Sequence, residues 1–226
     1  RDGGKYGRAG GFGGCAQGVG QLRVYHFVNS GHGLEDIRLR RLKIARIDKL
    51  NDPFEWQALT SSEPEKRRAM SALNQHQAQS TGILCFSRDW KNPVKWSHYA
   101  DHHQGLCLGF DVADHLLGEV RYVDKRLDVD WVLAAPTASE GNDRMRESLV
   151  TKFRHWRYEK EMRVFVKLDP KAEIDGLYFA DFTDQLSLAE VIVGARSLVN
   201  RSDLADALER DDVGVNRWGI HKAVEV

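Results

Sequence analysis

Apolar and polar residues alternate most regularly from 161 to 168, where Met162, Val164, Val166 and Leu168 occupy every second position. Successive side chains of a strand point to opposite faces, so this pattern predicts a half-buried strand. Other segments are rich in aliphatic, β-branched or aromatic residues and are bounded by turn residues. They predict further strands at 22–28, 39–47, 83–87, 105–111, 119–123, 188–193 and 222–226.

Helices are predicted where glycine is absent and start signals precede the segment. A Ser-Ser-Glu-Pro sequence introduces a polar, exposed helix at 63–79, and Pro93 precedes a short one at 94–102. We expect a third helix at 144–156 and a fourth that ends at 209, with Ser202 as its N-cap. A glycine-rich stretch at 30–33 leads to a short helix or turn. Strands mixed irregularly with short helices predict an α+β fold with a mixed, mostly antiparallel sheet and short flanking helices.

The chain divides into a leader and one domain. Residues 1–20 hold 9 of the 20 glycines and few residues that can build a core. Glycine loses much backbone entropy on ordering, so we expect residues 1–21 to be a disordered leader and residues 22–226 a single α+β domain. The first residue is Arg1, which is typical of a fragment or a processed product.

Composition narrows the class of protein. The 33 basic and 33 acidic residues cancel, so no global field favours nucleic acid or an anionic membrane. Apolar runs are shorter than the roughly 20 residues of a membrane span. The three cysteines lack C-x-x-C spacing, and Cys85 and Cys107 lie in apolar runs typical of buried thiols. We therefore expect a cytoplasmic protein with no membrane partner.

Four parts of the chain together resemble the domain-of-unknown-function 2971 family. The resemblance covers roughly residues 22–226 in family order and implies a bacterial setting in defence, in toxins or on mobile elements. Its motifs are 24–27 (VYHF), 50–55 (LNDPFE), 85–87 with 96–111 (CFS; WSHYADHHQGLCLGFD), and 156–163 (WRYEKEMR).

The pair Glu159 and Glu161 is the most informative constellation. Residues two apart in an extended segment face the same side, so both carboxylates should enter one site. An E-x-E pair at a strand entrance is similar to that of ADP-ribosyltransferases. That resemblance implies that Glu161 stabilises an oxocarbenium-like transition state and that Glu159 orients or deprotonates the acceptor. A structural ion pair with Arg163, Arg157 or Lys160 is the alternative.

The same resemblance implies NAD as the substrate and supplies the other positions of the pocket. His26 on the first strand would hold a ribose hydroxyl, and Tyr99 or Trp96 would stack on nicotinamide. Ser87 occupies the place of the transferases' S-T-S segment, although a clear S-T-S is absent. Ser97, beside Trp96, and Asn51, in a turn, complete the expected cofactor-binding residues.

Two further groups have open interpretations. His98 and His102 would lie one helical turn apart and so could bind a metal, but the H-E-x-x-H pattern is absent. A histidine in such a place more often hydrogen-bonds a backbone carbonyl or packs under a loop. No metal is expected. The basic run Arg38 to Arg46 is either a solvated face or a surface that steers a nucleotide or nucleic acid.

Two functions remain at the level of the sequence. The first is an ADP-ribosyltransferase-like enzyme that binds a nucleotide-like small molecule and modifies a protein or nucleic-acid acceptor. The second is a non-catalytic sensor or interaction domain in a bacterial defence or regulatory module. The first requires that His26, Tyr99 and Glu161 converge on one pocket. The second requires that Glu159 and Glu161 are satisfied by arginine partners and face no cavity.

Overall fold

The computed structural model describes residues 20–47, 50, 59–208 and 219–222. The leader predicted at 1–21 lies almost entirely outside these residues, as does Asn51. The strands are β1 (Gln21–Val28), β2 (Arg41–Arg46), β3 (Leu59–Thr60), β4 (Thr81–Ser87), β5 (Leu106–Ala113), β6 (Leu117–Glu119), β7 (Arg121–Val123), β8 (Leu127–Asp128), β9 (Thr151–Phe153), β10 (Glu161–Lys167), β11 (Tyr178–Asp181), β12 (Leu186–Val193) and β13 (Gly219–Lys222).

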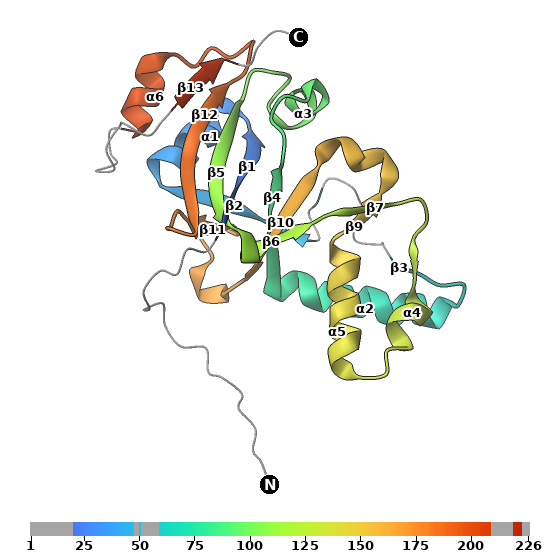
Figure 1. The fold of residues 1–226 in the computed structure, drawn as a ribbon. Helices are drawn as coiled ribbons and strands as arrows, with labels where there is room; N and C mark the ends of the chain where they lie inside the picture. Colours follow the sequence, from blue (N-terminus) through green and yellow to red (C-terminus); the bar gives the residue numbers. More distant parts are fainter. Residues whose placement is uncertain (1–19, 48–49, 51–58, 209–218, 223–226) are drawn as a thin grey trace.

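Helices α3 and α6 lie at one end of the molecule, and α2, α4 and α5 lie at the other (Figure 1). Of the described residues, no helix is long and apolar enough to cross a membrane. The α-helices are α1 (Ser30–Arg38), α2 (Pro64–Ser80), α3 (Pro93–Tyr99), α4 (Val129–Leu133), α5 (Ala138–Leu149) and α6 (Arg201–Leu208), and the 3-10 helices are η3 (Asp114–Leu116), η4 (Arg154–Glu159) and η5 (Pro170–Ala172).

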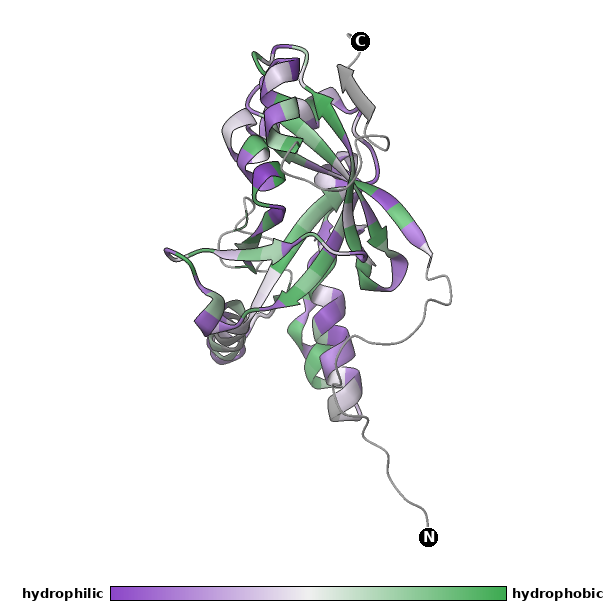
Figure 2. Cartoon of the chain, turned by 90° about the vertical axis from the view of Figure 1, so that its left-hand side faces the viewer, coloured by the Kyte–Doolittle hydropathy of each residue, from purple (hydrophilic) through white to green (hydrophobic). Residues whose placement is uncertain are grey.

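The predicted α+β class is confirmed, since a mostly antiparallel sheet carries short helices around it. The main sheet has the order β11-β2-β4-β1-β5-β12-β13, and β10 pairs with β4 and with β6. In the main sheet only β12 and β13 run parallel, whereas β3–β8 and β7–β9 form two small parallel pairs outside it. Hydrophobic residues concentrate on the strands and hydrophilic residues on the helices (Figure 2).

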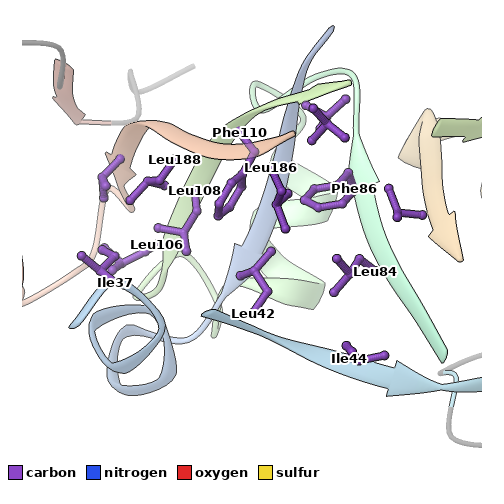
Figure 3. Close-up of a cluster of buried hydrophobic side chains, with 14 of the residues drawn as sticks. Ile37, Leu42, Ile44, Leu84, Phe86, Leu106, Leu108, Phe110, Leu186 and Leu188 are labelled. Carbon is purple, nitrogen blue, oxygen red and sulfur yellow. The ribbon is translucent and has the colours of Figure 1, made fainter. Parts of the chain in front are cut away.

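One face of the sheet builds the main core. Ile37 of α1, Leu42 of β2, Phe86 of β4, Phe110 of β5 and Leu188 of β12 turn towards the same interior (Figure 3). Phe110 is fully buried and meets Phe86 and Phe182 edge to face at ring-centroid distances of 5.9 and 5.1 Å. Aromatic edge-to-face packing of this kind adds to the area that burial removes from water.

Local capping explains several helix boundaries and corrects one. The side chain of Asn92 accepts a hydrogen bond from the backbone N–H of Val94 (2.9 Å), and Pro93 follows it at the first position of α3. For α6 the predicted N-cap, Ser202, is wrong. Asn200 accepts from the backbone N–H of Asp203 (3.0 Å), and α6 begins one residue before Ser202.

Two sequence predictions fail between 119 and 156. The strand expected at 119–123 is divided, because β6 pairs with β10 whereas β7 pairs with β9. The helix expected at 144–156 is α5, which starts earlier and ends at Leu149. Arg163 donates to the backbone oxygen of Leu149 (2.6 Å) at this end, and the following residues then enter β9. A contact from a distant strand therefore lies at the end of this helix, and local periodicity does not predict it.

Candidate functional site

A split in the main sheet creates a pocket. Since β10 occupies one edge of β4 along its whole length, β1 and β2 must share the other edge. β1 pairs there through Tyr25 and Ser87, and β2 at the far end through Ala45 and Ile83. A cavity of about 210 Å³ lies where β1 and β2 separate, and we call it the central pocket. Its lining comprises Tyr25, His26, Phe27, Ala45, Leu50, Cys85, Phe86, Lys95, Tyr99, Lys152, Glu159 and Glu161.

His26 completes the split edge with its side chain. Its ring Nδ1 lies 3.0 Å from the backbone oxygen of Cys85, and because a carbonyl can only accept, Nδ1 carries the proton. Burial lowers the pKa of His26, against the hydrogen bond to Cys85. The ring is therefore neutral near neutral pH, and its Nε2 is an acceptor on a residue that lines the pocket.

The two carboxylates of the E-x-E pair meet at one lysine. Lys152 Nζ binds Glu159 Oε2 and lies 3.1 Å from Glu161 Oε2. Both glutamates and Lys152 are only 5–6% exposed. Arg163 donates two hydrogen bonds to Glu161, of 2.8 and 3.1 Å. The Tyr99 hydroxyl donates to Glu159 Oε1. The glutamates are thus brought together and also paired with basic residues.

The sequence suggested an extended backbone from Glu159 to Glu161, but the structure has a turn there. Glu159 ends η4, Glu161 begins β10, and Lys160 between them is left-handed with φ 45°. The loop after β4 holds this turn through three successive carbonyls. Ser87 Oγ donates to Glu159 O (2.6 Å), the Arg88 N–H to Lys160 O (3.0 Å) and Asn92 Nδ2 to Tyr158 O (3.1 Å). Strain of roughly 1–3 kcal/mol at such a residue persists only where its surroundings fix it.

The surroundings of Glu159 and Glu161 shift the pKa values of the two carboxyl groups in opposite directions. Burial alone would raise the pKa of Glu161, but the charges and hydrogen bonds of Arg163 and Lys152 outweigh it and lower this pKa to about 2. Burial raises the pKa of Glu159 above its ordinary value, although Lys152 and the Tyr99 hydroxyl oppose this. Glu161 is therefore ionised near neutral pH, and Glu159 is the group better suited to exchange a proton.

Lys95 and Lys152 are pocket residues that sequence reasoning missed. Lys95 is 3% exposed, lies 4.3 Å above the ring of Phe27, and donates to the backbone oxygen of Asp89 (3.3 Å). Burial lowers its pKa to about 8. Burial also raises the pKa of the nearby Cys107 thiol well above its ordinary value, so that thiol stays neutral and supplies no counter-charge. Neither lysine shows a sequence signal, since each looks like an ordinary residue of a polar segment.

The remaining predicted residues divide into supporting and separate positions. Trp96 is a buried residue of α3. Its indole N–H donates to the backbone oxygen of Trp90 (2.6 Å), and it does not line the pocket. Ser87 is buried and supports the Glu159 backbone without lining the pocket. Ser97 is partly exposed on α3, outside the pocket lining.

The structure also shows where the two histidines and the basic run lie. α3 ends at Tyr99, and Asp101, His102 and His103 have φ of 46°, 52° and 71°, so His98 and His102 do not share a helix. Within the described ranges, no group of three or more His, Cys, Asp or Glu residues is placed to hold a metal ion. In the basic run, Arg41 lies 3.7 Å above the ring of Phe179, on a strand whose alternate residues are buried.

The central pocket thus joins a neutral histidine, a tyrosine, two carboxylates of different pKa and two buried lysines on an aromatic wall. Convergent polar groups in an apolar cavity are typical of a small-molecule site. No protein-family model, curated protein or solved structure matches this chain.

Proposed function

We propose that the central pocket binds the nicotinamide-ribose end of NAD and that the domain is an ADP-ribosyltransferase-like enzyme of the 2971 family. One observation carries this proposal. His26, Tyr99, Glu159 and Glu161 come from three separate parts of the chain and line the same cavity. Convergence of this kind was the requirement that the enzyme hypothesis placed on the fold.

The resemblance to the 2971 family also points to the central pocket as the binding site. All four of its motifs contribute residues to the pocket lining, among them His26 from the first, Cys85 and Tyr99 from the third, and Glu159 and Glu161 from the last. Of the second motif, the described part is Leu50, which also lines the pocket. Motifs that all border one cavity are better explained by binding of a common ligand than by stability of the fold alone.

The size of the pocket limits what enters it. A cavity of about 210 Å³ is smaller than the roughly 300–1,000 Å³ typical of sites that enclose a drug-sized ligand. It accommodates one end of a dinucleotide, and the remainder would extend outside. In that arrangement a neutral His26 accepts from a ribose hydroxyl, the rings of Phe27 and Tyr99 flank nicotinamide, and Glu159 receives the proton of the acceptor.

One observation favours the alternative of a non-catalytic sensor. Glu161 is held by Arg163 and Lys152 together, so its charge is already compensated. A carboxylate in this state stabilises a developing cation less than an isolated one does. If the pocket only binds its ligand, the ion network is a scaffold for ligand recognition and no bond is broken.

The test measures binding and turnover separately on the full chain. Calorimetry gives NAD affinity, and chromatography gives nicotinamide release with water as the acceptor of ADP-ribose, for the wild type, Glu159→Gln and the surface control Glu119→Gln. We expect saturable binding to all three proteins and a loss of release of about 10²-fold or more in Glu159→Gln alone. Binding without release in the wild type would establish the sensor alternative. No binding at millimolar NAD would refute NAD as the ligand.

A further inference from the structure

A second concave surface lies outside the central pocket, on η4. Arg154, His155, Arg157 and Tyr158 line an open hollow of about 510 Å³, which we call the η4 hollow. In Figure 1 this segment is the golden coil beside α3. The sequence here, Phe-Arg-His-Trp-Arg-Tyr from 153 to 158, mixes aromatic and basic residues throughout. None of the lining residues of the hollow belongs to the central pocket.

The cations of the hollow are available to a ligand. Arg154 is 59% exposed and pairs with Asp124 (2.8 Å), itself 66% exposed, so water and salt weaken this contact. Within the described part of the chain, the Arg157 guanidinium makes no ion pair or side-chain hydrogen bond. Two guanidiniums on one short helix present fork-shaped donors of the geometry that matches a phosphate group.

The aromatic residues offer stacking surfaces. Phe153 is 45% exposed, and its ring lies 4.7 Å from that of His155 in a tilted arrangement. The rings of Trp156 and Tyr158, which are partly exposed, are tilted at 6.0 Å, and Lys152 Nζ lies 4.8 Å from the Trp156 ring centroid. Phe153 and His155 are both exposed and offer the more accessible rings.

We infer that the η4 hollow binds single-stranded nucleic acid, with phosphodiester groups on Arg154 and Arg157 and unpaired bases on His155 and on Phe153, which lies beside the hollow against the His155 ring. Proteins bind single strands by combining aromatic stacking with cationic contacts to the backbone. Bases of a duplex are already stacked on one another, so exposed rings favour the single strand. This inference concerns binding alone and does not depend on the chemistry of the central pocket.

The test is fluorescence anisotropy of a labelled 12-nucleotide single strand with the full chain, at several salt concentrations. The double variant Arg154→Ala/Arg157→Ala removes both guanidiniums. Its matched control is Lys167→Ala/Lys171→Ala, which removes two exposed cations at the other end of β10. Seven strand residues place this control on the order of 20 Å away. Phe153→Ala tests stacking, and far-UV circular dichroism verifies the fold of each variant.

We expect the arginine variant to bind at least tenfold more weakly and to lower the slope of log K against log salt by about 1.4, since single strands give about 0.7 for each phosphate contact. Phe153→Ala should weaken binding about fivefold or more without changing that slope. The lysine control should stay within about twofold of the wild type. An absence of binding, an equal loss in the lysine control, or equally tight binding of a duplex or of inorganic polyphosphate would overturn the inference.

Discussion

Replacing Glu161 by glutamine tests whether this residue mainly stabilises the fold. The substitution keeps the size of the side chain but removes the charge that Arg163 and Lys152 share. Both cations then remain buried next to a neutral amide, with only Glu159 left to compensate them. We expect Glu161→Gln to fold but with a clearly lower free energy of unfolding.

The magnitude follows from the pKa of Glu161. Its lowering from 4.5 to about 2 corresponds to about 3 kcal/mol at neutral pH, because one pKa unit is worth about 1.4 kcal/mol. Removing one partner of a buried ion pair costs about 3–5 kcal/mol in general, which agrees. Since the folded pKa is the lower one, this stabilisation is complete above pH 4.5 and is lost as the pH falls towards 2.

Urea unfolding monitored by tryptophan fluorescence measures the effect between pH 7 and pH 3. The difference between wild type and Glu161→Gln should be about 3 kcal/mol at pH 7 and about half of that at pH 3. The control Glu119→Gln removes a carboxylate that is 62% exposed beside Arg88, and should cost under about 1 kcal/mol at either pH. Equal stability of Glu161→Gln and wild type at pH 7, or a difference that ignores pH, would refute the reasoning.

Four further variants follow from other buried groups. Burial raises the pKa of Asp36 to about 7, so Asp36→Asn should stabilise the protein by on the order of 3 kcal/mol at pH 7 and by little below pH 4, as measured by urea unfolding. Burial lowers the pKa of Lys95 to about 8, so wild-type stability should rise between pH 8 and 10, a rise that Lys95→Met should lack. Tyr99→Phe removes a hydrogen bond that favours ionised Glu159 and should raise the pKa of that carboxyl further in carboxyl NMR titrations. Phe110→Ala should destabilise the core by about 3–5 kcal/mol in thermal or urea unfolding, whereas an effect below about 1 kcal/mol would contradict its place there.

Much of the secondary structure could be predicted from the chain alone, because it depends on neighbours in sequence. The alternation from 161 to 168 and the apolar run at 105–111 correspond to β10 and β5, since side-chain period and burial are local properties of a strand. Asn92 followed by Pro93 likewise marks the start of α3. The E-x-E spacing also predicted that Glu159 and Glu161 reach one site.

Tertiary structure decided everything that depends on residues far apart in sequence. Glu159 and Glu161 converge through a left-handed Lys160 held by the loop after β4, rather than through an extended strand. Lys152 lies in the pocket because α5 ends at Leu149, where Arg163 of β10 binds the backbone oxygen, and β9 follows. Lys95 is buried because α3 packs against β1, where the ring of Phe27 lies beneath its ammonium group. Hydrophobic period fixes which face of a strand is buried, but the partners across that face are fixed by pairing that local sequence does not encode.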